Sequence, residues 1–119
     1  MSDERKSLGR QGEDVACRYL QNRGYTILER NFRCRLGELD LIARTGRELC
    51  FIEVKTRRDL SYGPPCLAVT PKKQETIRRL SHYYLSLHPA YRVLQPRLDV
   101  LELLARDGTW YVRYLPAAF

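Results

Sequence analysis

Residues 38–55, ELDLIARTGRELCFIEVK, consist of two apolar runs on either side of a Thr-Gly-Arg corner. Apolar runs that flank a tight turn predict a β-hairpin, and Gly46-Arg47 suits a two-residue turn with glycine in its first position. Thr45 then pairs with Glu48, and this pairing fixes every other pair of the hairpin. The hairpin therefore decides both the fold and the place of any site built on it.

Acidic side chains occur in both strands of this hairpin, although a strand bound for a core should avoid them. The register places Asp40 opposite Glu53 and Glu38 opposite Lys55. Because side chains alternate along a strand, these four residues are expected to share one face of the sheet. The opposite face is expected to pack into the core, because it is purely apolar and consists of Leu39, Leu41, Ile52 and Val54.

Carboxylates at directly opposed positions repel each other, because their Cβ atoms lie only about 4.5–5.5 Å apart. A divalent cation offsets this repulsion, and Mg²⁺ binds through one or two carboxylates while keeping waters for substrate oxygens. Together with Lys55, Asp40 and Glu53 are the residue types needed to hydrolyse a phosphodiester. Two alternatives stay open: Lys55 and nearby arginines neutralise the carboxylates as ion pairs, or the turn register differs by one residue.

The rest of the chain predicts the order α-β-β-β-α-β-β, with about five strands in a mixed or largely antiparallel sheet flanked by helices. The first helix is expected over residues 7–23, with Ser7 as its N-cap and Gly24 after its end. Thr70 and Pro71 are expected to open a second helix that His88 and Pro89 end, with Ile77, Leu80, Tyr84 and Leu87 as its apolar face. The remaining strands are predicted over residues 25–32, 97–105 and 109–115, with a loop at residues 63–65 and a turn at Asp107-Gly108.

Length and composition predict one basic domain. The chain has 119 residues and a formal net charge of +7, which favours a polyanionic partner such as nucleic acid. We expect one domain over residues 1–119, with residues 1–6 flexible. The charged N-terminus has no apolar leader, and no segment has the roughly 18 apolar residues needed to span a bilayer, so we expect a cytoplasmic protein without a membrane partner.

Several segments carry a resemblance to known proteins. Asp40, twelve intervening residues and Glu53-Val54-Lys55 resemble the bipartite motif of the PD-(D/E)xK nuclease superfamily. The segments GRQGEDVA (9–16), GELDLI (37–42), FIEVKTR (51–57) and RLDV (97–100) resemble the YraN-like family of small bacterial proteins, which is similar to archaeal Holliday-junction resolvases. The resemblance runs from about Leu8 to Tyr114 and implies a restriction endonuclease-like core.

The resemblance also implies roles for single residues. Asp40 and Glu53 match the metal ligands of the superfamily and Lys55 its catalytic lysine. Glu13 matches the helix acid that reaches towards the metal in resolvase-like members, and glycines at 9 and 12 would let its helix approach the sheet closely. An exposed acid in the first turns of a helix is the alternative for Glu13. Leu39 stands where the superfamily's name has proline.

Basic residues form the expected contact with nucleic acid, and the alternative is a solvated basic surface. They lie after the hairpin and in the second helix: Arg57, Arg58, Lys72, Lys73, Arg78 and Arg79. Aromatic residues of the last helix and strands, Tyr111 among them, have spacings that suit core packing. The cysteines, Cys17, Cys34, Cys50 and Cys66, are too dispersed to predict a zinc site and are expected to be reduced. Nothing in the spacing of Asp99 gives it a chemical role.

Three functions are compatible with these features. The first is a Mg²⁺- or Mn²⁺-dependent endonuclease that hydrolyses DNA, with branched or junction DNA as a candidate substrate. The second is a nucleic-acid-binding module that keeps the nuclease fold and cleaves nothing. The third is a protein-interaction module of DNA processing whose basic face docks an acidic protein. A homodimer is expected by analogy with junction-resolving enzymes.

Overall fold

The computed structural model describes residues 2–58 and 69–119, with side chains from residue 8 onward. In these residues five strands form one mixed sheet in the order β1-β2-β3-β4-β5. The parallel pair is β3 with β4, and the other neighbours are antiparallel. The elements are α1 (Ser2–Asn22), β1 (Thr26–Cys34), β2 (Gly37–Thr45), β3 (Glu48–Arg57), α2 (Pro71–Leu87), a 3₁₀ helix η2 (Pro89–Val93), β4 (Gln95–Arg106) and β5 (Thr109–Leu115). The predicted order and the mixed sheet are confirmed; η2 was not predicted.

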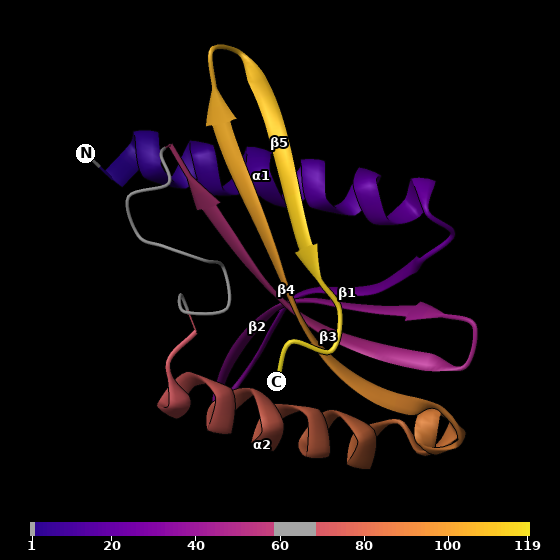
Figure 1. Ribbon diagram of the computed structural model, residues 1–119. Coiled ribbons are helices and arrows are strands. Elements are labelled where there is room, and N and C mark those ends of the chain that lie inside the picture. The colour runs from indigo at the N-terminus through magenta and orange to yellow at the C-terminus, as the bar shows by residue number, and fades with distance from the viewer. Residues whose placement is uncertain (1, 59–68) are drawn as a thin grey trace.

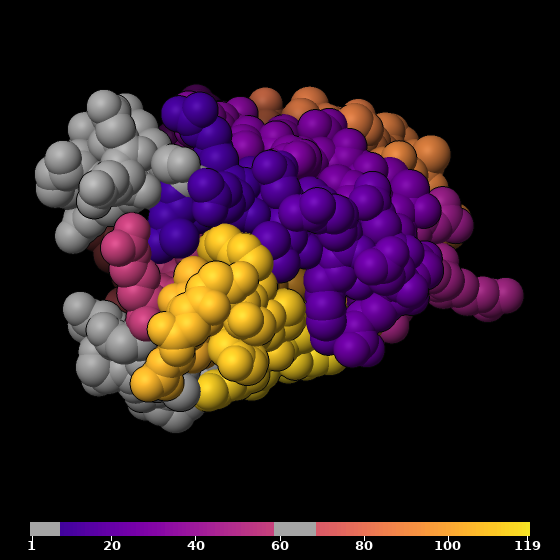
Figure 2. Space-filling model, turned by 90° about the horizontal axis from the view of Figure 1, so that it is seen from above, coloured from indigo at the N-terminus to yellow at the C-terminus, as the bar shows by residue number. Residues whose placement is uncertain are grey.

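The two long helices cover opposite faces of the sheet (Figure 1). α1 packs on a layer that includes Leu41, Ile52 and Leu101, and α2 on a second layer that includes Phe51 and Val100. In Figure 2, which views the molecule from above, α1 lies beside the hairpin formed by β4 and β5. Among the described residues, no helix combines the length and apolarity needed to cross a membrane.

Both predicted two-residue turns are present. Thr45 pairs with Glu48, and Gly46 between them has a φ of 54°, a left-handed conformation that glycine adopts without a steric penalty. At the other turn, Asp107 and Gly108 have φ values of 52° and 74°. The register predicted for the first hairpin is therefore correct over the pairs from Leu41 with Ile52 to Thr45 with Glu48. The loop predicted at residues 63–65 and Cys66 lie outside the described residues.

The prediction of one apolar and one charged hairpin face is confirmed for Leu41, Ile52 and Val54, which share one apolar layer, and is wrong for Leu39, because β2 changes faces at Asp40. Leu39 packs in the layer under α2, whereas Leu41 packs in the layer under α1. The neighbouring strand explains the change: Asn31, between the partners of Leu39 and Leu41, has a φ of 55°. A left-handed residue interrupts the alternation of side chains, and the local kink carries the partner strand with it.

Glu38 does not join Asp40, Glu53 and Lys55, with which it was predicted to share a face. Its exposed carboxylate lies 3.0 Å from Arg33 on β1, and the pairing of β2 with β3 begins only at Leu41. Because β2 kinks at Asp40, the straight-strand register that placed Glu38 opposite Lys55 does not extend past the kink.

α1 approaches the sheet closely at Gly12, where a Cβ atom would lie 2.3 Å from Thr56 Oγ1 on β3. Gly9 does not share this role: no heavy atom of another described segment lies within 4 Å of the place its Cβ would take. The helix begins at Ser2, so Ser7 lies inside it and is not its N-cap. Its end is as predicted, because Gly24 has a φ of 88° and Tyr25 N–H donates to Leu20 O.

α2 begins as predicted, with the Thr70 side chain accepting a hydrogen bond from Lys73 N–H and Pro71 in the first turn. Ile77, Leu80 and Tyr84 are buried, as expected for its apolar face. Leu87 is 50% exposed, which corrects its assignment to that face. It occupies the last turn, where the helix ends at His88.

Candidate functional site

Asp40 lies at the position where the ladder between β2 and β3 stops. Beyond the pair of Leu41 with Ile52, the Val54 N–H of β3 donates to Asp40 Oδ2 at 2.7 Å. The carboxyl group thus accepts the hydrogen bond that a backbone carbonyl of β2 would otherwise accept. This contact fixes Asp40 against β3, one residue from Glu53.

Asp40 and Glu53 form a hydrogen-bonded pair of carboxyl groups. Burial is the largest cause that raises the pKa of Asp40 to about 8, followed by the negative charge of Glu53 and the hydrogen bond with it. The Val54 N–H has the opposite, smaller effect on this pKa. The raised pKa favours a protonated Asp40 that donates to Glu53 at neutral pH. The sequence predicted two carboxylates that repel each other here, but not a proton shared between them.

Glu53 is only 4% exposed and has two lysines beside it. Lys55 Nζ, two residues along β3, and Lys73 Nζ, from the first turn of α2, each lie 3.6 Å from Glu53 Oε2. Roughly a third of each lysine side chain is exposed. The metal-free site therefore combines one carboxylate, one neutral carboxyl group and two ammonium groups, which leaves a surplus positive charge.

Glu13 reaches this region from α1. Its Oε1 accepts hydrogen bonds from Asn31 Nδ2 at 3.0 Å and from Arg30 at 3.4 Å, so β1 fixes its position. The negative charge of Glu13 is the smallest of the causes that raise the pKa of Asp40. Glu13 therefore lies near the carboxyl pair, held by β1 rather than by Asp40 or Glu53.

The donor set suits a hard divalent cation. In the described part of the chain, no three acidic, histidine or cysteine side chains converge closely enough to hold a metal by themselves. Mg²⁺ needs fewer protein ligands, because it binds through one or two carboxylates and completes its shell with water and substrate oxygens. Asp40 and Glu53 supply two carboxylates that repel each other when both are ionised, and a cation in place of the shared proton relieves that repulsion.

The structure separates the predicted basic residues into different roles. Lys73, predicted as a nucleic-acid contact in a helix where a polar residue could support the active site, lies in the site itself, 3.6 Å from Glu53 Oε2. Arg57 is largely buried, with Nε 3.0 Å from Glu102 Oε2, and Arg79 lies 3.4 Å from Glu75 on the same helix. The exposed members are Arg58, Lys72, Arg78 and Arg79, and the Arg78 guanidinium lies over the Phe119 ring.

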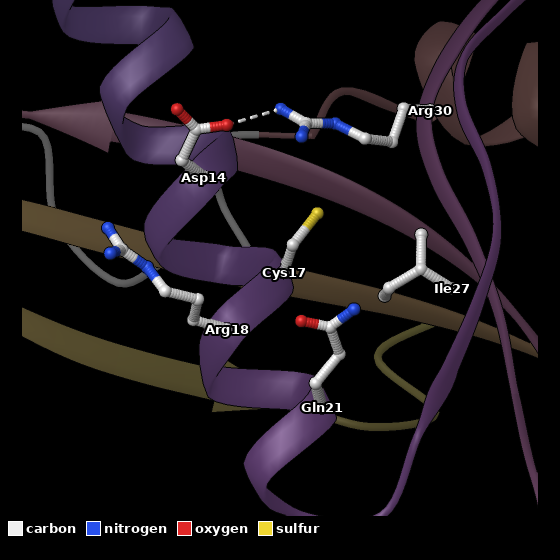
Figure 3. A pocket seen from close by; sticks show the side chains of 6 residues that line it. All are labelled: Asp14, Cys17, Arg18, Gln21, Ile27 and Arg30. Atoms are coloured by element: carbon white, nitrogen blue, oxygen red, sulfur yellow. Dashed lines mark hydrogen bonds and ion pairs between the residues drawn. The ribbon is translucent and has the colours of Figure 1, made fainter.

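A groove of about 360 Å³ lies between α1 and β1 (Figure 3). Cys17 points into it from α1, and Arg30 on the opposite wall is joined to Asp14 at 2.8 Å. Burial raises the pKa of the Cys17 thiol, so this cysteine is not an activated nucleophile. Arg30 therefore links the groove to the site by holding both Asp14 and Glu13.

Asp99 is the centre of a buried hydrogen-bond network that sequence reasoning missed. It is fully buried, accepts hydrogen bonds from Arg97 and Ala117 N–H, and is bonded to the Tyr114 hydroxyl. Arg97 also donates to the Tyr25 hydroxyl at 2.7 Å. The spacing of Arg97 and Asp99 by two residues, which puts them on one face of a strand, could have predicted their ion pair. Their other partners come from distant segments and could not be predicted in this way. Asp99 has a structural role.

Comparisons with known proteins give one consistent family. A family model described as "Uncharacterised protein family UPF0102" matches residues 12–103. A curated UPF0102 protein of Pelobacter propionicus is 50% identical over 110 residues, covering 88% of this chain and 76% of its own. Similar UPF0102 proteins of Syntrophotalea carbinolica and Acidothermus cellulolyticus are 47% and 44% identical; the alignments cover 100% and 97% of this chain, and 96% and 95% of theirs.

Proposed function

The chain belongs to the uncharacterised protein family UPF0102, and we propose that it is a divalent-metal-dependent endonuclease whose active site is built on Asp40, Glu53 and Lys55. The observation that carries this proposal is the contact between two carboxyl groups at the point where β2 leaves β3. Two buried acidic groups in contact cost folding free energy, so a strongly perturbed pair of this kind is a candidate functional site, and cation binding is a role that suits it.

We assign a separate role in phosphodiester hydrolysis to each side chain of the site. In the reaction a water oxygen bonds to phosphorus and loses a proton, while one P–O ester bond breaks and its oxygen gains a proton. Asp40 and Glu53 would hold the cation, and Asp40 would give up its proton on binding it. When bound, Mg²⁺ or Mn²⁺ supplies positive charge at the phosphate and lowers the pKa of water.

The two lysines are cations on flexible stems. Lys55 orients the attacking water or shares the negative charge that develops on the phosphate. Lys73 approaches the same Glu53 oxygen from α2 and adds positive charge where a phosphodiester would lie. Glu13, held by Asn31 and Arg30, completes the acidic side of the site and is the third candidate metal ligand.

The order of motifs supports the same assignment. Asp40 followed by Glu53-x-Lys55 on an adjacent strand resembles the PD-(D/E)xK arrangement, and the mixed sheet between two helices is compatible with that superfamily. DNA is the proposed substrate, and branched DNA is the candidate suggested by resemblance to junction resolvases. A cytoplasmic location and a homodimer belong to the same proposal.

A second function is favoured by one observation. Lys55 and Lys73 already compensate Glu53 in the metal-free protein, and the surplus positive charge would attract a phosphate without any cation. This arrangement suits a module that binds nucleic acid and does not cleave it.

The test is a cleavage assay on junction, flap, duplex and single-stranded DNA with Mg²⁺ or Mn²⁺. We expect cleavage by the natural protein and a loss of about 10²-fold or more in Asp40→Asn and Glu53→Gln. Asp107→Asn, the same chemical change in an exposed turn, is the control and should cleave normally. Undiminished cleavage by Asp40→Asn and Glu53→Gln would refute the assignment, and DNA binding without cleavage by the natural protein would favour the second function.

A further inference from the structure

The sheet face that carries Glu53 continues across β4 to β5. In the strand register, Glu102 lies between Lys55 and Arg113, and Leu104 lies between Arg57 and Tyr111. Residues at neighbouring positions of adjacent strands point to the same side of a sheet. The side chains of Tyr111 and Arg113 therefore share the face of Lys55, two strands away from it.

This part of the face is open. Tyr111 is 56% exposed, and the Arg113 side chain is 50% exposed. Between them lies a hollow of about 220 Å³ that Glu102 and Leu104 also line. In Figure 1 the end of the β4–β5 hairpin extends away from α2, the helix that covers this face elsewhere. The exposure of Tyr111 corrects the prediction that it serves core packing.

The charge of this surface is positive. Glu102 is 2% exposed and has two arginines beside it: Arg57 Nε at 3.0 Å and Arg113 Nε at 4.0 Å. The buried Arg57 is the closer partner, so it compensates the carboxylate. The exposed guanidinium of Arg113 then remains able to bind an anion, as does the Lys55 ammonium group at the edge of the site.

An exposed aromatic ring beside exposed cations, as Tyr111 lies beside Arg113 on β5, is a typical binding surface for unpaired nucleotides. Bases of a single strand stack on aromatic side chains. Because every base has a π-face, this contact forms with any nucleotide sequence. In a duplex these base faces are already stacked on their neighbours. Strands lie about 4.8 Å apart, so the backbones of β3 at Lys55 and β5 at Arg113 are separated by about 10 Å, a distance that a few unpaired nucleotides span.

We propose that this surface, defined by Tyr111, Arg113 and Leu104, binds an unpaired segment of nucleic acid that leads into the carboxyl-pair site. Tyr111 stacks on a base, and Arg113 contacts the phosphate next to it. The proposal rests on the proposed function, because it assigns to that site a substrate with a single-stranded segment, such as a flap, a gap or the opened arm of a branch.

Binding is measured in EDTA, where cleavage cannot occur, by fluorescence anisotropy of a labelled single-stranded oligonucleotide and of a duplex of equal length. Loss of stacking on one base corresponds to about 1–3 kcal/mol, so Tyr111→Ala should weaken single-strand binding by roughly 5- to 150-fold. Tyr111→Phe should bind as the natural protein does, because it keeps the ring. Tyr83→Ala removes an exposed tyrosine from α2 and is the matched control, which should not weaken binding.

A second measurement requires no variant: photocrosslinking of an oligonucleotide containing 5-iodouracil, with the attached residue mapped by mass spectrometry. We expect the crosslink at Tyr111. Unchanged binding by Tyr111→Ala together with a crosslink elsewhere would overturn the proposal while leaving the nuclease assignment intact. A change in sedimentation behaviour in Tyr111→Ala without a change in DNA binding would identify a protein interface and also overturn it. If Tyr111→Ala loses single-strand binding and the natural protein cleaves none of the DNA substrates, the binding surface is supported and the nuclease assignment is refuted.

Discussion

At the scale of single residues, Asp40 links stability to pH. Its pKa is raised from 3.8 in a model compound to about 8, so the folded protein holds a proton that the unfolded chain releases above about pH 4. The Asp40 contribution to the free energy of unfolding therefore falls as pH rises from about 4 to about 8 and stays low at higher pH.

Asp40→Asn should remove this pH dependence in the metal-free protein. The amide oxygen can still accept from Val54 N–H, and the amide nitrogen can donate to Glu53 as the protonated acid does. Thermal unfolding in EDTA should show equal Tm values below about pH 4, where the acid is neutral in both states, and a Tm advantage of the variant that grows up to pH 8.5, by about 4 °C for each kcal/mol. The control Asp107→Asn should follow the natural protein, and a Tm difference for Asp40→Asn that stays constant from pH 5 to 8.5 would contradict the assignment.

Lys55 is expected to act on the reaction rather than on the fold. Its ammonium group is partly exposed beside the buried Glu53, where it can reach a phosphate oxygen or water. Lys55→Ala should lower kcat by about 10²-fold or more and change metal affinity much less. Steady-state cleavage kinetics provide the measurement, with the exposed Arg92→Ala in η2 as a charge-loss control. An unchanged kcat would remove Lys55 from the mechanism.

The sequence predicted the main contact of this site but not its environment. The Gly46-Arg47 turn fixed the register that places Asp40 beside Glu53, because two-residue turns leave little freedom to the strands that they join. The burial of Glu53 could not be predicted, since it depends on how α2 packs on the sheet. Lys73 approaches Glu53 only because the second helix returns across that face.

At the scale of elements, the contact between α1 and β3 depends on Gly12. Both branches of Thr56 lie close to the place that a Cβ atom would take, at 2.3 Å and 3.2 Å, so rotation of this stiff side chain gives no relief. Gly12→Ala should therefore lower the free energy of unfolding by about 1–3 kcal/mol. Gly9→Ala, the same change in open space on the same helix, should raise it by up to about 1 kcal/mol.

Urea unfolding of both variants tests this contact. Gly12→Ala, Thr56→Ala and the double variant that combines them form a double-mutant cycle with the natural protein. The double variant should recover part of the loss, because alanine at 56 removes both close atoms. Equal stability of Gly12→Ala and Gly9→Ala would show that α1 does not approach β3 as closely as described.

Local rules also explain which elements were predictable. The start of α2 follows from Thr70 and Pro71, and the last hairpin from Asp107-Gly108, because each signal acts through its own backbone. The change of face in β2 has its cause in the neighbouring strand, at Asn31. A non-glycine residue with positive φ leaves no reliable trace in sequence, so the face of Leu39 could not be assigned correctly.

At the scale of the whole molecule, the Arg97–Asp99 network joins segments that are far apart in the chain. It connects β4 to Tyr25 after α1, to Tyr114 on β5 and to the C-terminal segment through Ala117 N–H. Asp99→Ala leaves the largely buried Arg97 with the half-exposed Glu48 as its remaining carboxylate and leaves Ala117 N–H without its acceptor, so it should destabilise the protein by about 3 kcal/mol.

Chemical denaturation measures this loss, with Asp99→Asn expected to fall between the natural protein and Asp99→Ala because it keeps part of the hydrogen bonding. Glu75→Ala breaks the exposed ion pair with Arg79 and should change stability by less than about 1 kcal/mol. A loss in Asp99→Ala no larger than in Glu75→Ala would contradict a network that holds the fold together.

The central claim is that Asp40 and Glu53 together bind one divalent cation. The most direct measurement is calorimetric titration of Mn²⁺ at pH 7 in two buffers with different ionisation enthalpies, for the natural protein, Asp40→Asn and Glu53→Gln. We predict one Mn²⁺ site that releases about one proton on binding, because Asp40 is protonated at this pH, and no binding at this site in either variant. Binding that is unchanged in both variants, or the absence of a Mn²⁺ site in the natural protein, would contradict this claim.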